Sequence, residues 1–417
     1  MDSLVISGGR RLEGKVEIPA AKNAALPLVC LSLLTDQAVK FSNLPNVADI
    51  GHLKVLLNDL GVNFSEASQE FKCSEIRSTK ATYDLVRKMR ASILVLGPLL
   101  AREKKAEVSM PGGCAIGERP VDIHLKGLEA LGATIKLDAG YIHASAAELR
   151  GCRFVLDFPT VTGTINLITA AVLAKGETCF ENVAREPEVV EVCDALIKMG
   201  AKIEGHGSSR ILIQGVDRLK GLDWTIQPDR IQFLTYLACG AITGGEIECY
   251  PYRKDTLNAV LQKFAEMGCE IVEKTGSVLL KAPSLLKPVD FETAPFPGFP
   301  TDGQAQLMAC LTVADSSGAS TIRETIFENR FNHVSELRRM GADIEVTGNL
   351  AVVKGVKSLS GASVMASDLR ASASLIIAAL KAKGESTILR VYHLDRGYEK
   401  LEDRLRALGA QVRRERN

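Results

Sequence analysis

The chain contains 417 residues, of which 46% are hydrophobic and 24% charged, and its formal net charge is +1. This composition is typical of soluble globular proteins, and the length suffices for two or more domains with separate cores. A nearly neutral chain with 5% aromatic residues argues against nucleic acid or a membrane surface as a partner. We find neither a secretory signal at the N-terminus nor an apolar run long enough to span a membrane, so we expect a cytoplasmic protein.

A helical pattern that ends in glycine and continues as a strand-like run occurs six times. The glycines lie 68 to 73 residues apart, at Gly61, Gly132, Gly200, Gly268, Gly341 and Gly409. Glycine just past a helix end favours the left-handed cap conformation, and the alternating runs that follow are typical of strands. A second helix rich in Ala and Leu recurs in phase, for example at 170–174 and 378–382, and such helices pack closely on all sides. The period predicts six similar α/β units, three in each of two domains.

Basic residues recur where strands give way to helices. Lys22 and Asn23 precede an apolar helix, Arg90 stands at the head of another, and Arg370 occupies an equivalent place. Arg330 and Arg396 lie in turns of their own. Each alone favours a structural ion pair or a solvated helix end. Their recurrence at the repeat junctions favours a shared anion site, because the planar guanidinium group suits carboxylate and phosphate.

The segment 111–120, Pro-Gly-Gly-Cys-Ala-Ile-Gly-Glu-Arg-Pro, places Cys114 in a glycine-rich loop with Arg119 five residues on. A nearby cation lowers the pKa of a thiol and favours the reactive thiolate. The alternative is a surface loop with an incidental cysteine. The ten cysteines are scattered without a Cys-x-x-Cys pair, so we predict reduced thiols rather than disulfides or a metal site.

One acid stands out after a proline-rich segment. Asp302 lies at a predicted helix start, where aspartate commonly caps the helix. Beside a basic cluster it is also a candidate general base.

These residues together resemble the enolpyruvyl transferase family over essentially the whole chain. The motifs that carry the resemblance are 22–26, 90–92, 111–122, 299–302, 327–331, 367–372 and 395–399. The resemblance implies a two-domain inside-out α/β barrel built from six βαβαββ units. It also implies that residues 22–228 form the first domain, which carries the Cys114 loop as a lid. Residues 1–21 and 229–417 then form the second domain, with the active site in the cleft between them.

The resemblance further implies transfer of enolpyruvate from phosphoenolpyruvate to the 3-hydroxyl of UDP-N-acetylglucosamine, with release of phosphate, in peptidoglycan synthesis. Lys22, Arg119 and Arg396 would hold the phosphate of phosphoenolpyruvate, Arg330 and Arg370 its carboxylate, and Asn23 would also bind this substrate. Cys114 would protonate the methylene carbon, Asp302 would accept the hydroxyl proton and Asp368 would assist. Cys114 would also be the target of fosfomycin. No metal, organic cofactor or obligate protein partner is implied.

For the nucleotide sugar, the resemblance points to residues on both halves of the chain: Asn23, Arg90, Arg119, Pro120, Val121, Asp122, Ile123, Thr160, Val161, Thr162, Gly163, Asp302 and Ile326. Asp122 would bond uracil, and the segment 160–163 would meet the diphosphate. That segment departs from the usual family pattern, although its hydroxyl groups and backbone amides survive. Gln232 stands where many family members have Glu, and Ala20 where Gly is usual.

Two alternatives remain open. The shikimate-pathway enolpyruvyl transferase shares the fold but lacks the cysteine lid. A catalytically silent paralogue that binds a nucleotide sugar is disfavoured because Lys22, Cys114, Asp302 and Arg396 are all present.

Overall fold

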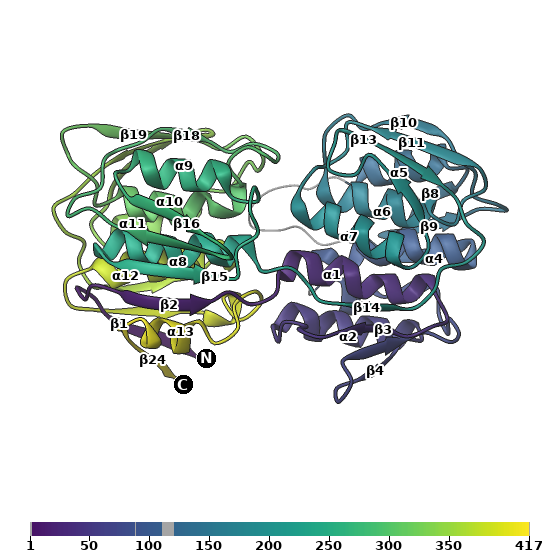
Figure 1. Ribbon diagram of the computed structural model, residues 1–417, viewed down its shortest axis with the longest axis horizontal. Coiled ribbons are helices and arrows are strands. Elements are labelled where there is room, and N and C mark those ends of the chain that lie inside the picture. The colour runs from purple at the N-terminus through teal and green to yellow at the C-terminus, as the bar shows by residue number, and fades with distance from the viewer. Residues whose placement is uncertain (1, 88, 111–120, 417) are drawn as a thin grey trace. The chain divides into compact units, whose positions relative to one another are not determined.

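The structure, a computed structural model, describes residues 2–87, 89–110 and 121–416. These residues form two compact units. Unit A contains the described residues of 20–227, and unit B contains those of 2–19 and 228–416. Each unit has a hydrophobic cluster of its own, and the two clusters share no residue. In both units sheets surround a group of central helices (Figure 1).

Unit A contains three four-stranded sheets. The first sheet has the spatial order β14 (Leu222–Trp224), β3 (Val39–Phe41), β5 (Glu70–Lys72) and β4 (Asn63–Ser65). The second has the order β6 (Lys80–Ala81), β7 (Lys105–Ser109), β9 (Tyr141–Ser145) and β8 (Thr134–Asp138). The third has the order β10 (Arg153–Val155), β11 (Glu177–Glu181), β13 (Arg210–Gln214) and β12 (Lys202–Glu204). Its helices are α1 (Lys22–Cys30), η1 (Leu31–Leu34), α2 (Ala48–Leu60), α3 (Tyr83–Val86), η2 (Arg90–Val95), α4 (Leu96–Glu103), α5 (Asp122–Ala130), α6 (Val161–Ala171) and α7 (Pro187–Lys198). The inner helices α1, α4 and α6 are almost wholly buried, as their apolar sequences require.

Unit B repeats this architecture. Its first sheet has the spatial order β16 (Glu270–Lys274), β17 (Ser277–Lys281), β15 (Glu246–Tyr250) and β2 (Glu13–Glu17). The second has the order β18 (Phe291–Glu292), β19 (Ala319–Arg323), β21 (Leu350–Lys354) and β20 (Asp343–Thr347). The third has the order β22 (Ser363–Met365), β23 (Glu385–Leu389), β1 (Ser3–Ser7) and β24 (Gln411–Glu415). Its helices are α8 (Arg230–Thr243), α9 (Asn258–Glu266), η3 (Thr301–Gly303), α10 (Gln304–Leu311), α11 (Val334–Arg339), α12 (Leu369–Lys381), η4 (Val391–His393) and α13 (Leu401–Ala407). The central helices α8, α10 and α12 contact one another and are buried along nearly their full length.

All six sheets have the same topology. In the sheet that begins with β10, the strands β10 and β11 pair in parallel and are connected through α6. Helix α7 then leads to the antiparallel hairpin of β12 and β13. This is the βαβαββ unit, and the predicted six-fold repeat of units is confirmed.

Three of the sheets are completed by a strand from a distant part of the chain. β14 pairs in parallel with β3, and β2 pairs in parallel with β15. β1 lies between β23 and β24 and is antiparallel to both. The two ends of the chain therefore lie side by side in unit B (Figure 1).

The six repeated glycines end their helices as predicted. Each has a positive φ, between 93° and 117°. Residues with a Cβ rarely adopt this conformation, so the backbone accounts for the recurrence of glycine at these positions.

No helix among the described residues is long and apolar enough to cross a membrane. Within 2–87, 89–110 and 121–416, the nine cysteines are free thiols, most of them buried. The same residues contain no cluster of three or more His, Cys, Asp or Glu side chains suited to a metal ion.

Candidate active site

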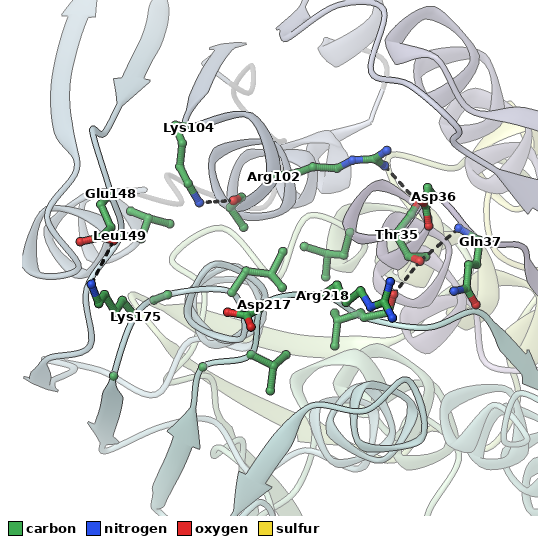
Figure 2. A pocket seen from close by; sticks show the side chains of 18 residues that line it. Thr35, Asp36, Gln37, Arg102, Lys104, Glu148, Leu149, Lys175, Asp217 and Arg218 are labelled. Atoms are coloured by element: carbon green, nitrogen blue, oxygen red, sulfur yellow. Dashed lines mark hydrogen bonds and ion pairs between the residues drawn. The ribbon is translucent and has the colours of Figure 1, made fainter.

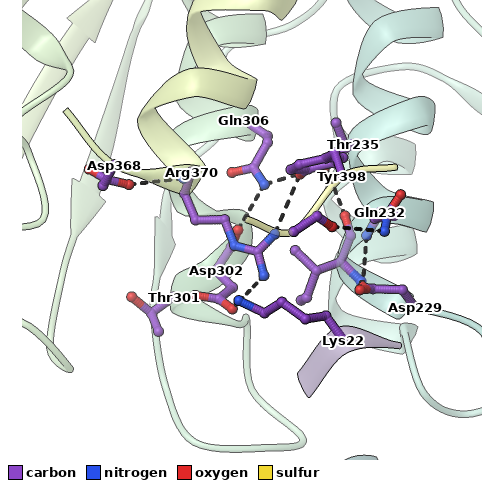
Figure 3. Close-up of polar contacts among 12 residues, drawn as sticks. Lys22, Asp229, Gln232, Thr235, Thr301, Asp302, Gln306, Asp368, Arg370 and Tyr398 are labelled. Carbon is purple, nitrogen blue, oxygen red and sulfur yellow. Dashed lines mark hydrogen bonds and ion pairs between the residues drawn. The ribbon is translucent and has the colours of Figure 1, made fainter. Parts of the chain in front are cut away.

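In unit B, two buried arginines converge on one carboxylate. Arg330 Nη2 lies 2.8 Å from Asp302 Oδ1. Arg370 Nη2 lies 2.8 Å from Asp302 Oδ2 (Figure 3). The arginine side chains are 4% and 6% exposed, whereas Asp302 is 27% exposed. The two guanidinium groups thus define a position at which a carboxylate binds with one strong hydrogen bond to each.

Asp302 does not cap a helix. It lies in η3, and neither η3 nor the following α10 has a side-chain hydrogen bond at its cap residue. The long-range partners of Asp302 explain the difference, because ion pairs with buried guanidinium groups are stronger than a bond to a helix-end amide. Of the two alternatives left by the sequence, the helix cap is therefore wrong.

Arg370 is held in place by a second layer of polar contacts. Its Nη1 lies 3.4 Å from Tyr398 Oη, which in turn lies 2.8 Å from Thr235 Oγ1 (Figure 3). Burial alone would lower the pKa of Arg370, but electrostatic interactions with Asp302, Tyr398 and Asp229 and the hydrogen bond to Asp302 together outweigh it, and the net shift is upward. Burial raises the pKa of Tyr398, so this hydroxyl stays protonated. Arg370 is consequently a fixed positive charge.

Glu324 connects Asp302 to the segment around Ile326. This buried carboxylate accepts bonds of 3.1 Å from Thr301 Oγ1, and its Oε1 accepts from the amides of Ile326 and Phe327 at 2.9 and 3.1 Å. The backbone at Ile326 is thereby tied to the residue preceding Asp302. The sequence analysis did not single out Glu324, since nothing in its local pattern distinguishes it from a surface acid.

Asp368 is the N-cap of α12. Its Oδ1 accepts from the backbone amides of Arg370 and Ala371 at 2.8 and 3.0 Å. This cap starts the helix that carries Arg370. The carboxylate also acts on His333, where burial lowers the pKa to about 4 and the charge of Asp368 partly opposes that shift.

Arg396 lies in the turn after η4. The next residue, Gly397, accepts a bond of 3.1 Å at its carbonyl from Gln232 Nε2. Gln232 thus donates a hydrogen bond that an ionised Glu at this position would be unable to donate.

In unit A, Lys22 is the first residue of α1. Its ammonium lies 3.0 Å from Asp49 Oδ2 in α2, and the two side chains are 11% and 2% exposed. Asn23 follows it, half-buried. The buried carboxylate of Asp49 orients the lysine, and the sequence analysis did not identify it.

Three other predicted segments of unit A are joined by two buried side chains, His124 and Asn166. Asn166 Nδ2 donates to Ile93 O at 2.9 Å, and Asn166 Oδ1 accepts from Gly97 N at 3.1 Å, which ties α6 to the helix that begins at Arg90. Asn166 Nδ2 also lies 2.9 Å from His124 Nδ1 in α5, whose Nε2 lies 3.5 Å from Thr162 Oγ1. A buried network of His124 and Asn166 therefore joins the helices that begin at Arg90, Asp122 and Val161.

The electrostatics of this network favour a neutral histidine. Burial and, to a smaller extent, the charge of Arg90 lower the pKa of His124 to about 4, with the charge of Asp122 opposing them. With Nδ1 accepting from Asn166, the ring proton belongs on Nε2 and points toward Thr162. Thr160 caps α6 by accepting from Gly163 N, so the segment 160–163 presents a helix N-terminus, which favours anions.

The remaining residues at the start of α5 differ in exposure. Val121 is buried, Ile123 is half-buried, and Asp122 is exposed and lies 3.8 Å from Lys126 Nζ. Val161 is half-buried in α6. Cys114, Arg119 and Pro120 lie outside the described residues.

A cavity of about 690 Å³ in unit A is separate from these residues (Figure 2). Its lining includes residues at or just beyond the C-terminal ends of η1, α4 and α6. Arg102 Nη1, on this lining, donates to the carbonyls of Leu33 and Thr35. Lys104 Nζ donates to Ala101 O. These cations satisfy helix-end carbonyls. No described residue predicted to belong to the active site lines this cavity.

Comparisons with known proteins agree with this architecture. The enolpyruvyl transferase NikO from Streptomyces tendae superimposes with a TM-score of 0.88 at 25% identity, covering 99% of this chain and 98% of that one. An EPSP synthase from Acinetobacter baumannii gives 0.77 at 16% identity over the whole of both chains. The two-domain arrangement of six units is thus the enolpyruvyl transferase fold.

The sequence comparisons extend over the full length. A sequence profile described as EPSP synthase (3-phosphoshikimate 1-carboxyvinyltransferase) matches residues 6–405. Proteins from Myxococcus xanthus and Zymomonas mobilis are each 52% identical, over 100% and 99% of both chains, and one from Novosphingobium aromaticivorans is 51% identical over 99% of both. All three are named UDP-N-acetylglucosamine 1-carboxyvinyltransferase. The chain belongs to the EPSP synthase family of enzymes.

Proposed function

We propose that this enzyme transfers the enolpyruvyl group of phosphoenolpyruvate to the 3-hydroxyl of UDP-N-acetylglucosamine and releases phosphate, a reaction of peptidoglycan synthesis. The names of relatives about half identical over the full length support this acceptor rather than a shikimate derivative. The structural observation that carries the proposal is the pair Arg330 and Arg370 bound to one carboxylate. Phosphoenolpyruvate has such a carboxylate, next to a phosphate that requires further cations.

The residue roles follow from that substrate. Arg330 and Arg370 hold the carboxylate, while Lys22 and Arg396, together with Arg119, hold the phosphate. Each well-placed cation orients the reacting carbon and stabilises charge that develops during the reaction. Lys22 and Arg119 belong to the domain 22–228, whereas Arg330, Arg370 and Arg396 belong to the domain formed by 1–21 and 229–417, and the proposed reaction requires both domains.

The chemistry is an addition followed by an elimination. Asp302 accepts the proton of the sugar hydroxyl while the oxygen of that hydroxyl forms a bond to C2 of phosphoenolpyruvate. Cys114 donates a proton to C3. In the second step C3 loses a proton, the bond from C2 to the phosphate oxygen breaks, and phosphate leaves. Asp368 assists the proton transfers. Alkylation of Cys114 by fosfomycin belongs to the same proposal.

The nucleotide sugar is bound by the buried network of unit A. The segment 160–163 offers the N-terminus of α6 to the diphosphate, and Arg90 adds positive charge. Asn23, residues 119–123 and the backbone of Ile326 complete the contacts, with Asp122 on uracil. Both substrates are small phosphorylated metabolites of the cytoplasm, where we place the activity. The proposed reaction involves neither nucleic acid nor a membrane and requires no obligate protein partner.

The test is phosphate release by the purified chain. With phosphoenolpyruvate and UDP-N-acetylglucosamine together we expect stoichiometric phosphate, and none with either alone or with shikimate 3-phosphate as acceptor. Release only with shikimate 3-phosphate would assign the enzyme to the other pathway. Binding of both substrates without any release would identify a silent paralogue.

A matched pair of variants ties the activity to the carboxylate position. R330Q should lower kcat/KM for phosphoenolpyruvate by at least roughly 10²-fold, because a buried charged contact to the reacting substrate is lost. R323Q changes an arginine in β19 that is 53% exposed and pairs with Glu292, and it should retain activity. Equal activity of the two variants would contradict the role of Arg330.

A further inference from the structure

Arg414, in the last strand of the chain, hydrogen-bonds two carboxylates at once, and its Nη1 also lies 3.5 Å from a third, that of Asp2. Its Nη1 and Nη2 donate to the two oxygens of Asp395 at 3.0 and 2.7 Å, and its Nε donates to Glu402 in α13 at 2.7 Å. The side chain is only 21% exposed. The hydrogen bonds to Asp395 raise the pKa of Arg414 further, so the group is always charged. A two-pronged pair of this kind fixes orientation as well as distance.

Asp395 directly precedes Arg396, and the other side of Arg396 is also anchored. The carbonyl of Gly397 accepts from Gln232 Nε2 at 3.1 Å, and Tyr398 Oη lies 2.8 Å from Thr235 Oγ1. Within the turn, the amides of Gly397 and Tyr398 both donate to Leu394 O at 3.0 Å. The backbone of Arg396 is thus held between two fixed neighbours, one of which depends on Arg414.

The adjacent Arg413 provides a comparison. It lies on the same strand, is 54% exposed, and pairs with Glu385 and Glu415, both in β-strands of the same sheet. Arg413 therefore strengthens the sheet, whereas the contacts of Arg414 extend from the sheet to the turn that carries Arg396.

We infer that Arg414 is a positioning residue for Arg396, which it acts on through Asp395. The inference rests on the proposed function, in which Arg396 holds the phosphate of phosphoenolpyruvate. Arg414 itself touches no substrate. Its role is to keep the turn of Arg396 in one conformation, because a small misplacement of a substrate-holding group costs a large factor in rate or affinity.

Steady-state kinetics of R414A, R414K and R413A test the inference. For R414A we expect the KM for phosphoenolpyruvate to rise at least about tenfold, with the KM for UDP-N-acetylglucosamine changed less than about twofold. R414K should be intermediate, since an ammonium group keeps the charge but not the fork. R413A should resemble the unmodified enzyme. If Arg414 served stability alone, kcat would fall with the folded fraction while both KM values stayed constant, and that result would overturn the inference.

Hydrogen exchange gives a second readout that needs no turnover. In R414A the amides of residues 394–398 should exchange at least about tenfold faster than in R413A, because local opening becomes easier. Unchanged exchange in this turn would overturn the inference. An unmodified enzyme that releases no phosphate would instead overturn the proposed function, with exchange still deciding the role of Arg414. Should R414A fail to fold, R414K carries both measurements with the same expected direction.

Discussion

The ion pairs of Asp302 with Arg330 and Arg370 have a chemical consequence. A carboxylate whose two oxygens each accept a charge-assisted hydrogen bond is a weak base. In the proposed reaction the carboxylate of phosphoenolpyruvate takes the same two guanidinium groups. Its arrival therefore displaces Asp302 and restores the basicity needed to accept the hydroxyl proton.

Asp302→Ala should separate binding from catalysis. Phosphate release should fall by roughly 10²- to 10⁴-fold because the general base is lost. The Kd for phosphoenolpyruvate, measured by calorimetry, should decrease, since the internal competitor for the arginines is gone. D343A, which alters an exposed acid of β20, should change neither quantity. Weaker binding of phosphoenolpyruvate to D302A would show that Asp302 does not occupy the substrate position.

The buried histidines predict a pH dependence of stability. Burial lowers the pKa of both His124 and His333 from 6.5 to about 4. Between these values the unfolded chain binds protons that the folded chain does not, so the free energy of unfolding falls as pH falls from about 6.5 to about 4. A shift of this size corresponds to roughly 3 kcal/mol for each group.

Urea unfolding of the unmodified enzyme and of H124N at about pH 7 and about pH 5 measures this effect, because pH 7 lies above the window of proton uptake and pH 5 lies within it. H124N keeps an acceptor for Asn166 but does not titrate, so its loss of stability on acidification should be smaller. An identical loss in both proteins would mean that His124 is already protonated in the folded state.

For individual residues, the sequence predicted which side chains belong to the candidate site better than it predicted which side chains they contact. Asp302, Arg330 and Arg370 were each identified, but their pairing connects positions 28 and 68 residues apart. His124 and Asn166 were missed because a polar residue within an apolar helix carries no local sign of what it binds. Such contacts depend on tertiary packing, which a local pattern does not record.

Among the elements, α4 and α6 pack closely at a glycine. A Cβ placed on Gly97 would lie 2.3 Å from Asn166 O and 2.5 Å from Thr169 Oγ1. Gly51, in α2, is also helical, but a Cβ there would meet nothing within 4 Å. Helix propensity alone favours Ala over Gly at both positions, but only Gly51 has room for the additional methyl group.

Opposite effects on stability should follow for the two Gly→Ala substitutions. G51A should stabilise the protein by roughly 0.5–1 kcal/mol, since Ala loses less backbone entropy in a helix. G97A should destabilise it by about 1–3 kcal/mol or more through overpacking. Thermal unfolding of both variants measures the difference. A stabilising G97A would mean that α4 and α6 separate without cost.

The period of the repeat was predictable because helix-ending glycines are a local requirement of the backbone. No local pattern predicts the strands that complete three of the sheets. β14, β2 and β1 pair with strands far away in sequence, and only the family resemblance implied that the N-terminal segment joins the C-terminal half.

For the molecule as a whole, the two separate cores predict separable responses to core mutations. I6A removes buried side-chain atoms from β1 in unit B, and L28A does so from α1 in unit A; both residues are fully buried. Each should destabilise its own unit by roughly 2–5 kcal/mol. Hydrogen exchange should accelerate throughout unit B in I6A and throughout unit A in L28A. Acceleration of both units in both variants would show that the cores unfold together.

The position of β1 between β23 and β24 also constrains how the protein is made. Translation delivers β1 first, yet both of its neighbours are among the last strands to be synthesised. All strands of unit A have been synthesised once residue 224 has emerged from the ribosome. At that point both edges of β1 are still unpaired, because β23 and β24 have not yet been synthesised. Unpaired strand edges in a nascent chain are open to aggregation. β1 thus acquires both of its partners only after β23 and β24 have been synthesised.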